Sequence, residues 1–311
     1  MTDQLNIGIR FALYANLMLL FGLPLFGLYA LNGAKRLQNA ILPLRALTTW
    51  LSVFGIALSV LGIAAMTASI AGVGMFDVDT ASISVMIFET PMGNAWVVRM
   101  FAMVCTLIAA FSVMGSNGLP KSVFVALGSG VALASIAWTG HGAAGEGSAG
   151  TAQLIADIIH LLSAGAWLGA LAALTLMLFR SAKTMSQEYL RLTHRLLAGF
   201  SVAGMVIVTL VIGSGLVNGW VLVGPHNITT LHTTPYGQFL IAKLLLLPIM
   251  LVLAATNRFR LTPAFGRVLH SGGTSAAVGK LRKSLALELG FFIIILGLVA
   301  WLGTLEPPAP L

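Results

Sequence analysis

The sequence is poor in charged residues, which make up 8% of its 311 residues, whereas hydrophobic residues make up 58%. A water-soluble domain carries charge on roughly a quarter of its residues, because it must cover its surface with groups that water solvates. The mean hydropathy of this chain is +0.96. The composition therefore excludes a soluble globular protein and indicates an integral membrane protein, with the lipid bilayer as its surroundings.

Cysteine is almost absent: Cys105 stands alone, which excludes an intrachain disulfide and any CxxC redox or metal motif. The sequence also lacks an HExxH motif, a phosphate-binding glycine loop and a Ser-His-Asp arrangement with its nucleophile on a loop. We therefore expect no enzymatic activity. The N-terminus, MTDQLNIGIR, has no basic leader and no clear cleavage site, so the first apolar run is expected to be a retained span.

Eight apolar runs are long enough to cross a bilayer, which takes about 20 residues per helix. They are residues 11–31, 47–72, 94–115, 122–140, 152–178, 196–222, 238–256 and 284–304. These runs predict an all-α, polytopic membrane protein, an eight-transmembrane-helix bundle that forms one integral membrane domain over residues 1–311. The GxxxG pairs Gly165/Gly169 and Gly215/Gly219 are expected to let helices approach one another closely.

Lysine and arginine are missing from every second connection between these runs. The connections without them are residues 73–93, 141–151 and 223–237, and the charged residues in these segments are all acidic. Apart from Arg10, Arg99 and Lys243, each basic residue lies in or beside the opposite connections. The positive-inside rule then places both termini outside, which in a bacterium is the periplasm. The net charge of +8 thus reports orientation, and no nucleic acid partner is expected.

Asp157 and His160 lie in the apolar fifth run, three residues apart and therefore on one face of a helix. Ionisable groups inside a span are rare and are usually functional. We interpret the pair as a metal-ligating imidazole with a carboxylate that orients it, the alternative being a hydrogen-bonded pair that only holds helices together. His141 ends the preceding run on the same outer side, just before the loop GAAGEGSAG.

Other polar residues lie on the outer side or just below it. His226 and His232, in GPHNITTLHTTPYGQ, are further candidate metal ligands by their side and chemistry, although their spacing matches no known metal site and solvated loop histidines are the alternative. Arg99 and Lys243 lie about one turn into their spans, where they either extend to the interface or face the bundle and balance the charge of Asp157.

Two further stretches carry structural expectations. Glu288 is predicted about one turn into the last span from the inner side, where the helix dipole or neighbouring basic residues would stabilise its charge. We assign Glu288 a structural role. Residues 80–90, TASISVMIFET, fit a helix that lies on the membrane surface somewhat better than a plain loop.

Several stretches together resemble the CopD family of copper-resistance membrane proteins. They are RFALYANLMLLFGLPLFGLYAL, MGNAWVVRM, TGH, DIIHLLSAGAWLGAL, HRLLAGFSVAG, TPYGQFLIAKLLLL, NRFRLTP and the final RKSLALELG with WLGTLEPP. The resemblance covers nearly the whole chain, and the order of these stretches agrees with the eight predicted spans.

The resemblance implies an inner-membrane protein that handles copper, expected to carry copper ions from the periplasm across the membrane. It implies a periplasmic copper-binding partner of the CopC type, which would be a separate protein because the sequence contains no such domain. The family's histidines match His141 in TGH and His160 in DIIH, whereas His226 and His232 fall in no matching motif. The oxidation state of the copper ion stays open.

Two other functions fit the same residues. A b-type haem protein that passes electrons would use histidines from facing spans as axial ligands, yet only His160 lies clearly inside a span. An assembly factor would hand copper to another protein at the outer face without transporting it.

Overall fold

The computed structural model describes residues 2–31, 42–112, 119–140, 147–180, 186–271 and 274–308. Eight helices in these ranges are long and apolar enough to cross a membrane, and no strand occurs in them. The predicted all-α, polytopic membrane fold is therefore confirmed. The spanning elements are α1 (Thr2–Ala30), α3 (Leu44–Ala71), α5 (Pro91–Ser112), α6 (Leu119–Ala134) with the 3-10 turn η2 (Ser135–Thr139), α7 (Gly147–Leu178), α8 (Gln187–Val223), α9 (Pro235–Thr256) with η7 (Asn257–Leu261) and α10 (Thr262–Ser271), and α11 (Thr274–Leu302).

Several helices extend well beyond their predicted apolar runs. Helix α8 has 37 residues and is about 55 Å long, compared with about 30 Å for the hydrocarbon core of a bilayer. Its first turns carry Arg191 and Arg195, and Ser186 caps them by accepting a hydrogen bond from the backbone N–H of Tyr189. Hydropathy marks only the stretch that lipid surrounds, whereas backbone hydrogen bonding continues through the polar turns at each end.

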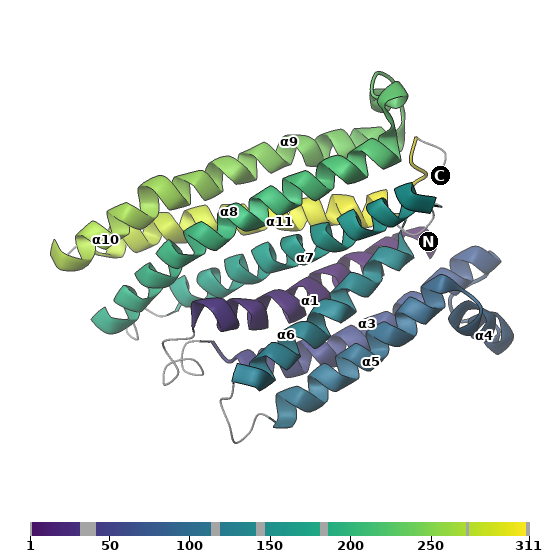
Figure 1. Cartoon of the computed structure of the whole chain (residues 1–311), viewed down its shortest axis with the longest axis horizontal. Helices are drawn as coiled ribbons and strands as arrows, with labels where there is room; N and C mark the ends of the chain where they lie inside the picture. The colour runs from purple at the N-terminus through teal and green to yellow at the C-terminus, as the bar shows by residue number, and fades with distance from the viewer. Residues whose placement is uncertain are drawn as a thin grey trace.

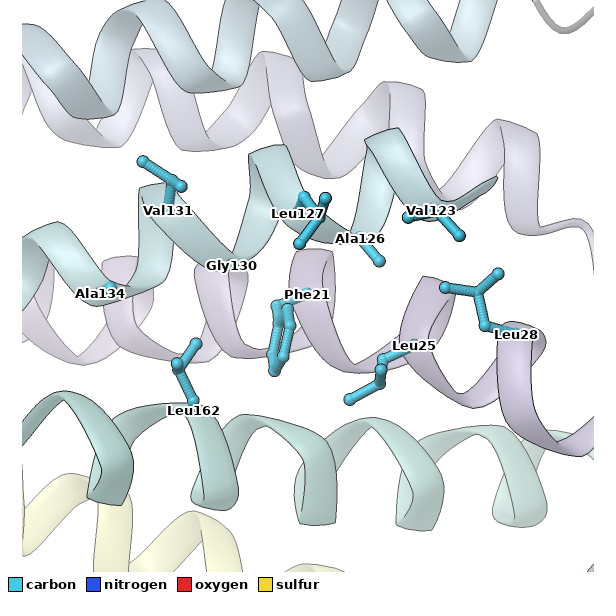
Figure 2. Close-up of a pocket in the computed structure, with 10 residues that line it drawn as sticks. All are labelled: Phe21, Leu25, Leu28, Val123, Ala126, Leu127, Gly130, Val131, Ala134 and Leu162. Atoms are coloured by element: carbon cyan, nitrogen blue, oxygen red, sulfur yellow. The ribbon is translucent and has the colours of Figure 1, made fainter. Parts of the chain in front are cut away.

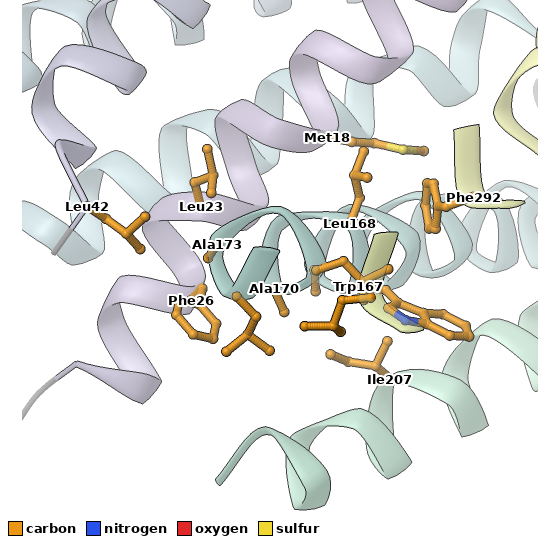
Figure 3. Close-up of a cluster of buried hydrophobic side chains, with 14 of the residues drawn as sticks. Met18, Leu23, Phe26, Leu42, Trp167, Leu168, Ala170, Ala173, Ile207 and Phe292 are labelled. Carbon is orange, nitrogen blue, oxygen red and sulfur yellow. The ribbon is translucent and has the colours of Figure 1, made fainter. Parts of the chain in front are cut away.

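Helix α7 is the central element of the bundle and packs against α1, α8 and α11 (Figure 1). Its contact with α1 is close because glycines face each other: a Cβ at Gly22 would meet the backbone of Gly165 and come within 2.8 Å of the Cα of Gly169. The first predicted GxxxG pair thus serves helix packing. Figure 3 shows the buried side chains around this contact, among them Phe26 of α1 and Leu168 of α7.

The two termini lie at the same end of the bundle as α4 and the connection between α8 and α9 (Figure 1). Helix α4 (Thr80–Phe88) confirms the helical interpretation of residues 80–90. Asp79 begins it, and its carboxylate accepts a hydrogen bond of 2.6 Å from the backbone N–H of Ser82. Hydrogen bonding to the side chain and to the backbone N–H of Ser82 holds the pKa of Asp79 below its usual value. The connection between α8 and α9 consists of two short 3-10 turns, η5 (Pro225–Asn227) and η6 (Leu231–Thr233).

The predicted position of Glu288 was wrong. Helix α11 begins at Thr274, so Glu288 lies about four turns after its start and not in the first turn. Its side chain is 2% exposed and accepts hydrogen bonds from Trp167 and Asn257. Neither a helix N-terminus nor a neighbouring basic residue provides these contacts. The first turns of α11, which contain Lys280, Arg282 and Lys283, are polar, and hydropathy alone does not distinguish a polar helical turn from a connection.

Candidate metal site

Asp157 and His160 lie on α7 and face α8, as residues three apart on one helical face can. Helix α8 meets them with Ser214 and Asn218, which are four residues apart and so also share a face. The Nδ2 group of Asn218 donates a hydrogen bond of 3.2 Å to Oδ1 of Asp157. The polar residues of the fifth span therefore meet a polar face of the sixth.

The imidazole of His160 is oriented by α8. Its Nδ1 atom lies 3.1 Å from the carbonyl oxygen of Val211 and 3.1 Å from Oγ of Ser214. A carbonyl oxygen can only accept, so Nδ1 carries the ring proton and donates it. The hydroxyl of Ser214 donates to the carbonyl oxygen of Leu210 at 2.5 Å, so it too meets Nδ1 as an acceptor. The lone pair of the neutral ring is then on Nε2, and this nitrogen is the one available to a metal ion.

The sequence had pointed to Asp157 as the group that orients this imidazole. The hydrogen bonds that fix the ring come instead from Val211 and Ser214. Both residues lie in the apolar run of α8, and Val211 acts through its backbone, which no sequence motif marks. Ser214 and Asn218 could have been found from the sequence, since they are polar residues at helical spacing within one span.

Lys243 enters the same site from α9. Its ammonium group attracts the carboxylate of Asp157 and acts on the imidazole of His160 as a nearby positive charge. A basic residue near the end of a span can extend to the interface or face the bundle, and Lys243 faces the bundle. Helices α7, α8 and α9 thus bring a carboxylate, an amide, an imidazole and an ammonium group together.

Arg99 also faces the bundle interior, and it is 3% exposed. Its Nε donates a hydrogen bond of 2.9 Å to Oγ of Ser135, and Nη2 lies 3.4 Å from the carbonyl oxygen of the same residue. Ser135 begins η2, which leads to Gly140 and the TGH motif. The guanidinium therefore holds the C-terminal end of the fourth span, and its hydrogen bonds do not go to Asp157.

Two of the remaining candidate histidines are exposed, and the third lies outside the described residues. His226 in η5 and His232 in η6 are exposed on the connection between α8 and α9. His141 lies outside the described residues. Among the residues that the structure does describe, no three His, Cys, Asp or Glu side chains lie close enough together to hold a metal ion. His160, His226 and His232 therefore do not form a common metal centre with one another.

A cavity of about 460 Å³ lies between α1, α6 and α7 (Figure 2). Its lining is entirely hydrophobic apart from the backbone of Gly130. The lining residues are Phe21, Leu25, Leu28, Val123, Ala126, Leu127, Gly130, Val131, Ala134 and Leu162. Because these side chains offer no metal ligand, the cavity does not compete with the Asp157/His160 region as a metal site.

Comparison with known proteins links the chain to copper resistance proteins. The family model described as copper resistance protein D-like, N-terminal domain, matches residues 1–151, and the model described as copper resistance protein D matches residues 194–302. Copper resistance protein D of Pseudomonas syringae pv. tomato is 44% identical over 309 residues, which cover 99% of this chain and 98% of the relative.

Two other relatives are more distant. The inner membrane protein YebZ of Escherichia coli (strain K12) is 27% identical, with 97% of this chain and 98% of the relative covered. The copper transport protein CutJ of Bacillus subtilis (strain 168) is 31% identical over 257 residues, which cover 80% of this chain and 45% of that protein. No solved structure matches the chain. With eight spanning helices and this degree of identity along its whole length, the chain belongs to the copper resistance protein D family of membrane proteins.

Proposed function

We propose that this protein moves copper ions from the periplasm across the inner membrane, through a site formed by α7, α8 and α9. The observation that carries the proposal is the orientation of His160, whose Nδ1 is bonded to α8 so that Nε2 is left to bind a metal ion. Imidazole binds copper in both of its common oxidation states. The names of two relatives, a copper resistance protein and a copper transport protein, support copper as the cargo. The role is transport and not catalysis.

The direction follows from the proposed orientation, in which both termini and the α8–α9 connection face the periplasm. The distribution of basic residues supports it, because the bundle end opposite the termini carries Arg191, Arg195 and Arg260, among others. The Asp157/His160 site then lies in the outer half of α7. It would receive copper from the periplasm before any cytoplasmic group could.

The charged neighbours suit a site that is alternately empty and occupied. Asp157 supplies the negative charge that favours a cation in a partly buried position, and Lys243 balances that charge when no copper is bound. The Oδ1 atom of Asn218 is buried without a hydrogen-bond partner among the described residues. This oxygen lies beside Asp157 and can accept a hydrogen bond from a water molecule that hydrates the incoming ion.

His160 alone cannot hold copper, so other ligands must join it during transport. In this proposal His141 binds copper first and passes it to His160. The exposed His226 and His232 receive copper from a separate periplasmic partner of the CopC type. This division gives each histidine a testable role that depends on its depth.

Replacing His160 with Ala should reduce copper accumulation in cells to the level of cells without the protein, because the buried ligand is lost. His232→Ala should lower the rate of accumulation without abolishing it, because the deeper site remains. Ser129→Ala is the matched control, since Ser129 is buried in α6 and bonds only to Val125 and Ala126 of its own helix. Wild-type accumulation by a well-expressed His160→Ala protein would disprove the proposed site.

Purified protein in proteoliposomes separates transport from delivery at the outer face. Copper that reaches the lumen in a His160-dependent manner supports transport, whereas copper binding without flux identifies an assembly factor. The visible spectrum of the same sample tests the haem alternative: a Soret band would reject copper transport in favour of electron transfer.

A further inference from the structure

The protein contains a second polar cluster, deeper in the bundle, around Glu288 of α11. Trp167 of α7 donates a hydrogen bond of 3.0 Å from Nε1 to Oε1 of this carboxyl group. Asn257, the first residue of η7, donates a hydrogen bond of 2.8 Å from Nδ2 to Oε2. Each carboxyl oxygen therefore has one donor, and the donors come from two other spans.

No cation contacts this carboxyl group in the described part of the chain. The basic residues nearest in sequence to its neighbours are engaged elsewhere: Arg258 donates to the carbonyl oxygen of Ser201 at 2.8 Å, and Arg282 donates to that of Leu178 at 2.6 Å. Lys280 and Lys283 are exposed. An ionised carboxylate that is buried without a cation is costly, and a proton is the smallest partner that removes the cost.

The surroundings of Glu288 can satisfy both of its protonation states. The ionised form accepts the two N–H groups already described. The protonated form has an O–H to donate, and two buried acceptors are available for it: Oδ1 of Asn257, and Oγ of Ser284, one turn before Glu288 on α11. Neither oxygen has a hydrogen-bond partner among the described residues, and the two side chains are 7% and 8% exposed. Rotation of the Asn257 amide by half a turn exchanges its donor for its acceptor.

The backbone at Asn257 is itself irregular. Residues Asn257–Leu261 form a π-helical segment between α9 and α10. Such segments are short, and they occur frequently at functional sites. Here the segment starts at the residue whose amide contacts Glu288. The π-helical segment and the unpartnered oxygens are independent observations, and both concern residues next to Glu288.

The cluster is linked to the proposed copper site by α7. Trp167 lies seven residues after His160, which is two helical turns and about 10 Å along the same face. Figure 3 shows its indole between Ile207 of α8 and Phe292 of α11, and the Trp167 and Phe292 ring centroids are 6.4 Å apart in an edge-to-face contact. A shift of α7 that accompanies metal binding at His160 would therefore move the donor that contacts Glu288.

We propose that Glu288, with Trp167, Asn257 and Ser284, is a proton-binding site whose loading and release drive copper movement. The proton bonds to a carboxyl oxygen of Glu288, the O–H then donates to Asn257 or Ser284, and release returns the proton to water. The coupling to copper rests on the transport function proposed above, whereas the binding of a proton at Glu288 does not.

Three elements contribute the polar groups around the Glu288 carboxyl group. Helix α7 contributes Trp167, η7 contributes Asn257, and α11 itself contributes Ser284. Helix α8 contributes Ile207 beside the indole (Figure 3). Helices α1, α9 and α10 also pack against α11. None of the residues named here titrates, so Glu288 is the group among them that takes up the proton.

Infrared difference spectra of the purified, membrane-reconstituted protein, recorded across a pH titration without copper, test the proton site directly. The wild type should show the C=O stretch of a protonated buried carboxyl group that appears on acidification, and Glu288→Gln should lose it. Glu89→Gln, at an exposed position after α4, and Asp157→Asn are the matched controls, and both should retain it. No such band in the wild type, or an unchanged band in Glu288→Gln, would overturn the proposal.

Trp167→Phe provides a second variant in case Glu288→Gln does not fold. It removes the N–H donor to Oε1 while leaving the carboxyl group in place, so the band should move to higher frequency. A band that stays at the wild-type frequency would show that it comes from another carboxyl group and would overturn the assignment.

The coupling is then tested by copper flux into proteoliposomes with and without an imposed pH gradient. Wild-type flux should respond to the gradient, and Glu288→Gln should carry copper down its own gradient without that response. An equal response in both proteins would overturn the coupling. If the wild type carries no copper while the infrared band still depends on Glu288, the transport function fails and the proton site stands.

Discussion

The orientation of His160 by α8 predicts that Ser214→Ala weakens copper binding although Ser214 touches no metal. Ser214 provides one of the two acceptors for Nδ1, and the carbonyl oxygen of Val211 provides the other, each at 3.1 Å. Loss of the partner that orients a metal-binding histidine typically lowers metal affinity by about 10–100-fold. Because one of two acceptors remains, we expect the lower end, about tenfold, which is about 1.4 kcal/mol of binding free energy.

Competition with a chromogenic copper chelator measures this change on protein purified in mild detergent. The comparison should include His160→Ala, which should bind most weakly, and Ser129→Ala, which removes a buried serine bonded within α6 and should bind like the wild type. Ser214 also bonds to the backbone of its own helix, so the folding of the variant should be checked by its thermal unfolding. Wild-type affinity in Ser214→Ala, together with weak binding in His160→Ala, would refute the role of α8 in orienting the ring.

Two further predictions concern stability. Gly22→Ala should lower the unfolding temperature in detergent, because the new methyl group would meet the backbone of Gly165 and Gly169 and cost about 1–3 kcal/mol of stability. Gly8→Ala is the control, since nothing lies within 4 Å of a Cβ at that position. Equal unfolding temperatures of the two variants would contradict the close α1–α7 contact. Asp79→Asn should make the stability of helix α4, measured by hydrogen exchange, less dependent on pH. The pKa of Asp79 in the folded protein lies below its ordinary value of 3.8. The carboxylate therefore stabilises α4 above that value, and this contribution is lost as the pH falls through the folded pKa. Exchange from α4 that is identical in both proteins at all pH values would contradict the cap.

Helix α7 carries residues of both polar clusters. This helix contacts α1, α8 and α11, and it carries both the Asp157/His160 pair and Trp167. The two family models match residues 1–151, which end in the first turns of α7, and residues 194–302, which follow it. Helix α7 therefore packs between the parts of the chain that the family models describe.

Arg99 shows a different use of charge inside the bundle. Its guanidinium is bonded to the side chain and the carbonyl oxygen of Ser135, at the point where α6 tightens into the 3-10 turn η2. Serine and carbonyl oxygens satisfy a buried arginine without a carboxylate, because its fork of donors can contact both at once. We expect this contact to set the direction in which the chain leaves the fourth span toward His141.

The sequence by itself determined the membrane class, the eight spans and the helix at residues 80–90. Each follows from a property that acts along the chain: the length of an apolar run relative to the bilayer, or the period of a helix. It also marked Asp157 and His160, because charged or titratable groups in hydrocarbon are rare. The sequence also predicted close helix packing at the Gly165/Gly169 pair, since only small residues let two helices in lipid approach so closely.

Only the tertiary structure decided which groups these residues meet. Val211 acts on His160 through a backbone carbonyl oxygen 51 residues along the chain, and nothing in its side chain indicates this. Glu288 was placed near a helix start by hydropathy, yet it meets Trp167 and Asn257 in the middle of the bundle, 121 and 31 residues away. Hydrogen bonds between spans depend on the rotation and register of whole helices, and these are set by packing across the bundle and not by any local pattern.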